Sequence, residues 1–304
     1  MAESRESVQG RVLRELIAHV ASDNLIGRKL KTGELRKKMV EPAWKCPDCF
    51  LMQKIKMPDF DMELLTAKEP NERYVILQLH GGGYIGKMRN AYRMFAGLYS
   101  EVGRGSSVLT IDYRVAPEHP YPAALEDAVT AYKWLIKCGF TAEQIILAGD
   151  SAGGGLAMAL CMYLRDEGMA MPAGIVAMSP WTDMTASGES YDTNYEKDPL
   201  FGKTRDSLIY NRDYAGEEDV TNPYLSPLFG DFTGFPPMLI QVGSYEMLLS
   251  DSVLVAKKAK RQGVKVRLSI YKGMFHVFQM AMMLMPESRH AWMEIGRFLK
   301  KIEQ

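Results

Sequence analysis

The feature that most constrains this chain is a serine between glycines, directly after a short apolar run. Residues 145–148 are apolar and are followed by Gly149, Asp150, Ser151, Ala152 and Gly153. The pattern Gly-x-Ser-x-Gly after a strand is typical of a nucleophile elbow, a tight turn that exposes a serine at the start of a helix. A side chain at either glycine would collide with the neighbouring strand or helix. We therefore predict a strand, a sharp turn at Ser151 and a helix.

A second glycine-rich turn distinguishes this motif from an ordinary loop. The apolar run 74–79 ends in His80, Gly81, Gly82 and Gly83. Ester hydrolysis passes through an oxyanion, which backbone N–H groups bind only where no side chain blocks close approach. We expect the N–H groups of Gly82, Gly83 and Ala152 to form this oxyanion hole, and His80 to shape the loop through hydrogen bonds.

The alternative for this loop is a phosphate-binding turn. No Lys-Ser or Lys-Thr pair follows the glycines as in a P-loop, and the spacing Gly-x-Gly-x-x-Gly is absent. The two motifs together indicate a serine hydrolase.

With the segment 112–124 (DYRVAPEHPYPAA), these motifs resemble the hormone-sensitive-lipase-like branch of the α/β-hydrolases, a family of carboxylesterases. The resemblance runs from about residue 75 to 280. It implies a triad in the chain order Ser, acid, His, short acyl esters as substrates, and a helical cap over the active site.

His276 is the best candidate for the triad base, because it follows the last predicted strand. His19 and His290 lie on terminal helical patterns, and His119 lies in a proline-rich turn.

Two carboxylates compete for the triad acid. The resemblance places the acid a few residues beyond the strand 238–242, where Glu246 stands, with a second acid farther on at Asp251. Asp251 also suits the first turn of the following helix. We favour Glu246, although aspartate is commoner at this position in the family.

The substrate pocket is expected near Tyr84, Met274, Phe275 and Val277. In relatives, the residue at the position of Tyr84 is often tryptophan or phenylalanine, and the residue at the position of Val277 is often glycine. Methionine is flexible and polarizable, which suits an adaptable pocket, although core packing is the alternative for the methionines after His276.

Strand-like runs alternate with helical patterns, which predicts an α/β fold with a mostly parallel sheet and helices on both faces. We assign 46–186 and 235–304 to the catalytic core. The amphipathic start, 1–45, and the segment 187–234 fall outside the alternation and are predicted to form the cap. A helix docked on the sheet edge is the alternative for the first.

The composition agrees with a soluble enzyme. The 37 basic and 37 acidic residues balance, so no nucleic-acid partner is implied. No apolar run is long enough for a membrane span and no secretory leader is evident, so we expect a cytoplasmic protein. The mechanism needs no cofactor or metal. Relatives in the family often form dimers through the last strand, here 264–271.

Cys46 and Cys49 form a Cys-x-x-Cys pair that suggests a redox or zinc site. The other two cysteines have no cysteine or histidine partner at metal spacing, so we expect two incidental thiols in a turn.

Two other functions use the same residues. An amide or formamide hydrolase would need the same triad, and paired ester and amide substrates would distinguish it. A noncatalytic small-molecule receptor would keep the pocket and lose the base, whereas Ser151 and His276 are both present here.

Overall fold

The computed structural model describes residues 6–21, 29, 32–34, 41–71 and 73–302. An eight-stranded sheet crosses this part of the chain in the order β1-β2-β4-β3-β5-β6-β7-β8. β1 and β2 pair in an antiparallel manner, as do β2 and β4, and every other neighbouring pair is parallel. The strands are β1 (Phe50–Lys56), β2 (Asp61–Ala67), β3 (Val75–Leu79), β4 (Ser107–Asp112), β5 (Ile145–Asp150), β6 (Gly174–Met178), β7 (Met238–Gly243) and β8 (Val266–Tyr271).

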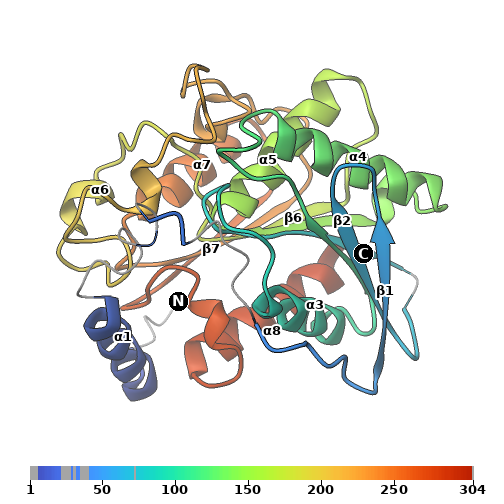
Figure 1. Ribbon diagram of the computed structural model, residues 1–304, viewed down its shortest axis with the longest axis horizontal. Coiled ribbons are helices and arrows are strands. Elements are labelled where there is room, and N and C mark those ends of the chain that lie inside the picture. Colours follow the sequence, from blue (N-terminus) through green and yellow to red (C-terminus); the bar gives the residue numbers. More distant parts are fainter. Residues whose placement is uncertain (1–5, 22–28, 30–31, 35–40, 72, 303–304) are drawn as a thin grey trace.

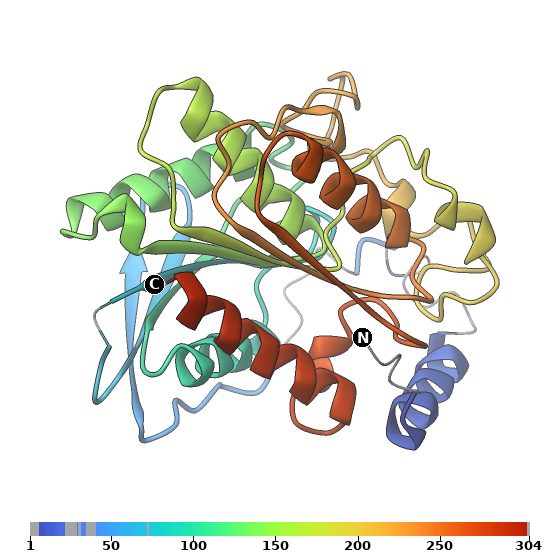
Figure 2. The same cartoon turned by 180° about the vertical axis from the view of Figure 1, so that it is seen from behind.

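Helices cover both faces of the sheet (Figures 1 and 2). On one face lie α4 (Ala123–Lys137), α5 (Ala152–Asp166) and α7 (Leu249–Arg261). On the other lie α3 (Asn90–Val102) and α8 (Pro286–Ile302). Each face has its own buried apolar cluster, because the central strands are buried on both sides. The predicted α/β-hydrolase fold is confirmed.

The element boundaries are close to those expected. The sequence patterns predict strands at 107–112 and 174–178 and a helix at 123–137, and β4, β6 and α4 have these ranges. The first strand is predicted at 54–57, whereas β1 begins at Phe50, four residues earlier. The extra residues pair with the end of β2, from Phe50 opposite Ala67 onward. β1 has few buried side chains, so its sequence gives little hydrophobic signal.

The segment 187–234 packs onto the end of the sheet with little regular structure. It contains α6 (Ser190–Thr193) and the 3-10 turns η2 (Leu208–Tyr210) and η3 (Pro227–Phe229). A further turn, η1 (Ala142–Gln144), precedes β5, and η4 (Phe278–Ala281) follows His276. The segment is held by aromatic and aliphatic side chains buried in the core, among them Tyr191, Phe201, Leu208, Tyr214 and Phe232.

The N-terminal helix α1 (Val8–Ala21) packs beside η4 and α8. Leu13 and Ile17 contact a buried cluster that contains Met274 and Phe278. The apolar residues Val12, Leu13, Leu16, Ile17 and Val20 recur at helical spacing, which predicts an amphipathic stretch from Glu6 to about Lys38 with a buried apolar face. Val12 and Leu16 are 58% and 56% exposed, so this prediction is wrong for them. The stretch beyond α1 lies mostly outside the described residues.

Within the described residues, no helix is both long and apolar enough to cross a membrane.

Candidate active site

Ser151 lies at a strained turn between β5 and α5. Its backbone angles, φ 52° and ψ −122°, are in a region that L-residues rarely adopt. Two hydrogen bonds fix the turn, from Ser151 N to Met178 O and from Trp181 N to Ser151 O, both 2.9 Å long. A Cβ atom on Gly153 would lie 2.0 Å from the Leu79 carbonyl oxygen, so only glycine allows α5 to approach β3 this closely.

His276 and Glu246 meet on the β7–β8 side of the serine. His276 follows β8, Glu246 follows β7, and His276 Nδ1 lies 2.9 Å from Glu246 Oε2. The other carboxylate oxygen, Oε1, accepts hydrogen bonds from Ser179 Oγ at 2.7 Å and from the Gly243 N–H. Because both oxygens have partners and Glu246 is fully buried, the carboxylate is held in one orientation.

The His276 imidazole is enclosed by its neighbours. Burial raises the pKa of the Asp150 carboxyl, in the residue before Ser151, to about 7, and the charge of His276 opposes that rise. Phe201, from the segment 187–234, contacts the same ring with a centroid distance of 4.6 Å. Ser151 and His276 are 6% and 8% exposed, so the two side chains are almost completely enclosed.

Asp251, the competing acid, is directed elsewhere. Its Oδ2 atom accepts hydrogen bonds from the N–H groups of Thr182 and Asp183, at 2.7 and 2.9 Å. Burial raises the pKa of its carboxyl to about 8, and the neighbouring Asp183 adds to the rise. This carboxyl therefore fixes the loop that leads into the segment 187–234 and has no hydrogen bond to His276.

The glycine loop after β3 supplies free backbone donors. Gly82 and Gly83 have φ angles of 112° and 62°. Their N–H groups donate to no acceptor among the described residues, whereas the Gly82 carbonyl accepts from Ile85 and Gly86. Ala152 begins α5, where N–H groups have no partner within the helix and the helix dipole favours negative charge.

Asp150 connects this loop to the elbow. Its carboxylate accepts hydrogen bonds from the Gly81 N–H at 3.2 Å and from Tyr92 Oη at 3.3 Å. A Cβ atom on Gly81 would lie 2.3 Å from Asp150 Oδ2, so glycine is required for this approach. The serine turn and the glycine loop are thereby held together by one buried side chain.

His80 is fully buried beneath the loop. Its Nδ1 atom lies 2.7 Å from the Gly81 carbonyl oxygen, and its ring stacks on Tyr113 with a centroid distance of 4.0 Å. Burial lowers the pKa of the imidazole, which favours the neutral ring. These contacts agree with a role in shaping the loop.

The four expected pocket residues are all buried. Tyr84 stacks on Tyr214 with a centroid distance of 3.9 Å. Val277 lies in the core cluster below the sheet, and Met274 and Phe275 lie in the cluster beneath α1. These contacts account for the burial of the four side chains without a substrate, and their role in a pocket stays a prediction.

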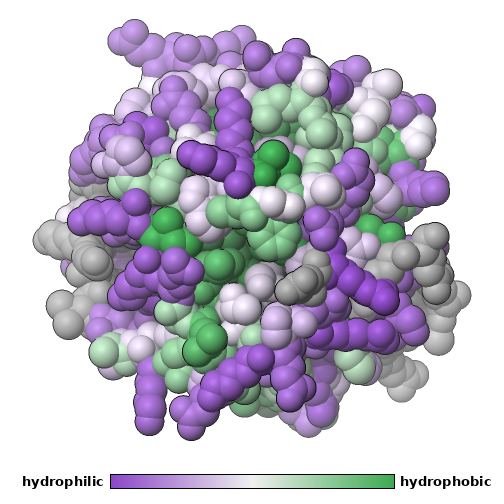
Figure 3. Space-filling view, turned by 90° about the vertical axis from the view of Figure 1, so that its right-hand side faces the viewer, coloured by the Kyte–Doolittle hydropathy of each residue, from purple (hydrophilic) through white to green (hydrophobic). Residues whose placement is uncertain are grey.

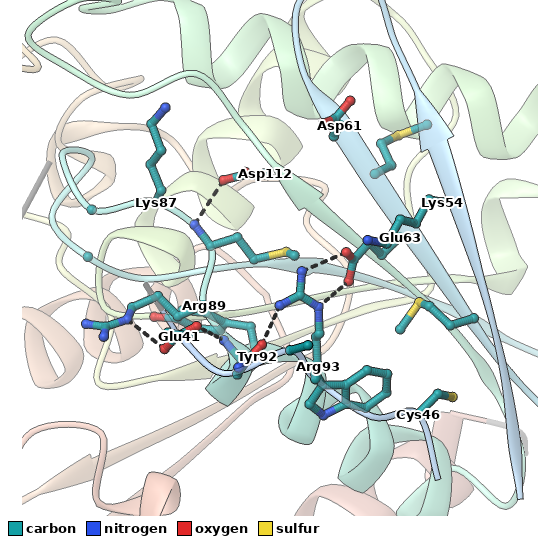
Figure 4. Close-up of a pocket in the computed structure, with 18 of the residues that line it drawn as sticks. Glu41, Cys46, Lys54, Asp61, Glu63, Lys87, Arg89, Tyr92, Arg93 and Asp112 are labelled. Carbon is teal, nitrogen blue, oxygen red and sulfur yellow. Dashed lines mark hydrogen bonds and ion pairs between the residues drawn. The ribbon is translucent and has the colours of Figure 1, made fainter. Parts of the chain in front are cut away.

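A cavity of about 990 Å³ lies beside the glycine loop, over the strands β4, β2 and β1. We call it the lateral cavity. It is enclosed by residues 41–46, the β1–β2 hairpin, the loop residues 81–93, Asp112 and Leu208. Inside it, Arg93 faces Glu63 (Figure 4). Figure 3 shows that apolar side chains gather in the middle of the face near the hairpin, with hydrophilic side chains around them.

Cys46 of the Cys-x-x-Cys pair lines the lateral cavity, just before β1. Both thiols are free; Cys46 is half-buried and Cys49 is exposed. Among the described residues, no cluster of three or more histidine, cysteine or acidic side chains could hold a metal ion.

Several residues of this site were missed by sequence reasoning. Ser179 follows β6, between the two strands that carry the elbow and Glu246, and a polar residue at that position is a usable signal. Tyr92, Phe201 and Leu208 lie in helical or irregular segments where no local pattern marks them.

Comparisons with known proteins identify the family. A family model described as the alpha/beta hydrolase fold matches residues 76–280. The acetyl-hydrolase of Streptomyces hygroscopicus is 39% identical over 225 residues, which is 74% of this chain and 75% of that protein.

Two solved structures cover nearly the whole chain. An esterase from the bacterial hormone-sensitive lipase family has a TM-score of 0.85 and 34% identity, over 99% of this chain and 100% of that one. EstE5, soaked by p-nitrophenyl butyrate, has a TM-score of 0.86 and 34% identity, over 97% and 99% of the two chains. The chain therefore belongs to the α/β-hydrolase fold family and, within it, to the hormone-sensitive-lipase-like carboxylic ester hydrolases.

Proposed function

We propose that this protein hydrolyses short-chain acyl esters through an acyl-serine intermediate, with Ser151 as nucleophile, His276 as base and Glu246 as acid. The observation that supports the triad best is the 2.9 Å approach of His276 Nδ1 to Glu246 Oε2, beside the elbow that carries Ser151. A neutral imidazole that donates from Nδ1 keeps Nε2 available to accept a proton.

The first step forms the acyl-serine. His276 accepts the Ser151 proton while Oγ bonds to the ester carbonyl carbon, and the carbonyl electron pair moves onto oxygen. The N–H groups of Gly82, Gly83 and Ala152 bind this oxyanion. When the intermediate collapses, the bond to the alcohol oxygen breaks and His276 returns its proton to the departing alcohol.

The second step releases the acid. Water takes the place of the alcohol, gives a proton to His276 and attacks the acyl carbon. The Ser151 ester bond then breaks, and the proton returns to Oγ. Glu246 orients the imidazole throughout and stabilises its positive charge, and Ser179 holds the carboxylate in place.

The segment 187–234 and α1 are proposed as the cap. Phe201 contacts His276, and Leu208 packs against Gly83, so the first of these segments supplies walls on both sides of the triad. The enclosed serine supports small substrates, because a nucleophile that is 6% exposed leaves little room around its hydroxyl. EstE5 was soaked by p-nitrophenyl butyrate, and the same ester is a suitable first substrate here.

The test is hydrolysis of p-nitrophenyl butyrate followed on the millisecond timescale. Wild-type protein is expected to release up to one equivalent of p-nitrophenol in a burst if deacylation is slower than acylation, and to form a butyryl adduct on Ser151 detectable by mass spectrometry. Ser151→Ala should lose both the turnover and the adduct. Equal turnover by the alanine variant would overturn the proposal.

A further inference from the structure

The sheet order divides the surroundings of Ser151 into two halves. The elbow follows β5, and both His276 and Glu246 come from the β7–β8 half. The glycine loop follows β3, and the lateral cavity extends from it over β4, β2 and β1. Among the described residues that line this cavity, neither Ser151 nor His276 is present.

The chemistry of ester cleavage assigns the two substrate halves to these two sides. His276 must give its proton to the departing alcohol oxygen, so the alcohol half has to lie on the β7–β8 side. The carbonyl oxygen is directed to the N–H groups of the glycine loop and Ala152. The remaining substituent of the carbonyl carbon is the acyl chain. It therefore lies on the side that faces away from His276.

We infer that the lateral cavity receives the acyl chain of the substrate, that Leu208 forms its near wall, and that the Arg93–Glu63 ion pair limits the chain length it accepts. This inference rests on the proposed function, because it takes His276 as the group that protonates the alcohol.

Leu208 stands between the oxyanion loop and the cavity. Its side chain lines the cavity and packs against Gly83, where an added Cβ atom would lie 2.5 Å from Leu208 Cγ. It is 8% exposed and comes from the 3-10 turn η2, whose backbone is fixed by the bond from Tyr210 N to Ser207 O. A bulky group next to the carbonyl carbon would collide with this side chain before entering the cavity.

The Arg93–Glu63 pair lies farther along the cavity. Arg93 Nε and Nη2 donate to the two oxygens of Glu63 at 2.6 and 2.7 Å, and Arg93 Nη1 donates to Asn90. Glu63 is only 6% exposed, so an apolar chain that reaches the pair removes its remaining solvent without replacing any hydrogen bond.

The ion pair lies well away from the elbow. Glu63 is on β2, which is three strands from β5 in the order β5-β3-β4-β2. Three strand spacings are about 14 Å, so short acyl chains end before the pair. We therefore expect kcat/KM to rise with acyl length at first and to fall once the chain is long enough to reach the pair.

The experiment uses two matched ester series. One varies the acyl chain as p-nitrophenyl acetate to dodecanoate and includes the branched pivaloate; the other keeps acetate and varies the alcohol from phenol to 1-naphthol. The kcat/KM of each ester is divided by that of p-nitrophenyl or phenyl acetate. Active protein is counted by titration with a fluorophosphonate, so partial unfolding does not distort the ratios.

Two variants probe the two walls. Leu208→Ala should raise the pivaloate-to-acetate ratio about 10-fold. Glu63→Leu/Arg93→Met, which replaces the ion pair by apolar side chains, should raise the decanoate-to-butyrate ratio about 10-fold. Neither should change the alcohol series. Arg267→Met, which breaks an ion pair with Glu294 on the β8 side, is the matched control and should leave both series unchanged.

Each result either supports or overturns the inference. If the cavity variants change the alcohol series instead, the cavity holds the leaving group; if they change neither series, it is not a substrate site. Both outcomes overturn the assignment of the lateral cavity to the acyl chain. The proposed function stands in either case, provided that the wild-type protein hydrolyses esters and Ser151→Ala does not. A wild-type protein that hydrolyses no ester overturns the proposed function first.

Discussion

Glu246 and Asp251 are five residues apart in the chain, and both are buried, yet they lie in two different regions of the molecule. Glu246, in the loop after β7, contacts a histidine that can become positively charged. Asp251, in the first turn of α7, contacts backbone N–H groups of the loop that enters the segment 187–234. One region holds the two groups of the proposed proton transfer, and the other fixes the attachment of a segment.

The difference shows that burial of a carboxyl group does not identify a catalytic acid. Burial, with a contribution from the neighbouring Asp183, raises the pKa of Asp251 to about 8, so the uncharged carboxyl is favoured at neutral pH. A neutral carboxyl can complete a hydrogen-bond network, but it cannot stabilise an imidazolium ion. The partner of each side chain, rather than its exposure, separates the two roles.

The largest effect is expected from Glu246→Gln. An amide can donate to His276 Nδ1 and so favours the wrong tautomer, and comparable changes lower kcat about 10³- to 10⁴-fold. The kcat for p-nitrophenyl butyrate measures this loss. Asp251→Asn is the matched control. It should keep kcat within about 10-fold, or about 1.4 kcal/mol, because Asp251 has no hydrogen bond to His276. Equal losses in both variants would remove the distinction between the two regions.

The second effect concerns stability. Asp251→Ala leaves two buried N–H groups, of Thr182 and Asp183, without their acceptor, at a cost of about 2–3 kcal/mol. The Tm should fall by roughly 4–8 °C. Glu246→Gln, which keeps its size and one acceptor oxygen for Ser179 and Gly243, should change the Tm less. Calorimetry of both variants at pH 6 measures the two changes in Tm. A larger fall in Tm for Glu246→Gln than for Asp251→Ala would contradict the prediction.

Ser179→Ala tests the support of the catalytic acid. Ser179 Oγ donates to Glu246 Oε1 and accepts from the Val277 N–H, so its loss frees the carboxylate on one side. We expect kcat to fall about 10-fold, the equivalent of one hydrogen bond of about 1.4 kcal/mol. An unchanged kcat in the alanine variant would mean that Gly243 alone orients Glu246.

The smallest effect is a pH dependence of stability. The pKa of Asp251 is raised on folding. The contribution of this carboxyl to the free energy of unfolding is therefore fully present below its unfolded pKa, near 4, and is lost as the pH rises toward 8. Asparagine cannot ionise. The Tm of Asp251→Asn relative to wild type should therefore increase between pH 5 and pH 9. A constant difference would show that Asp251 does not titrate in this range.

Much of this site was predictable because it rests on short-range backbone requirements. The turn at Ser151 and the loop at Gly82 and Gly83 need small residues at fixed offsets, and such needs are visible in the sequence. The buried parallel strands were equally visible as continuous apolar runs.

The remainder depends on contacts between distant segments. Ser179 meets Glu246 from 67 residues away, and Tyr92 meets Asp150 from 58 residues away. Leu208 reaches Gly83 from a segment with almost no regular structure. On α1, Leu13 and Ile17 are covered, whereas Val12 and Leu16 are exposed, because the helix contacts the protein through the edge that carries Leu13 and Ile17. No local pattern contains these pairings.

The backbone of Ser151 has a consequence for attempts to engineer this enzyme. Glycine adopts the angles of that residue without the strain that serine bears, which is of order 1–3 kcal/mol. Replacing the nucleophile with glycine should therefore make the protein inactive without making it less stable. A library screened for thermal resistance alone would accumulate such dead variants, so every round of selection on this scaffold has to include turnover.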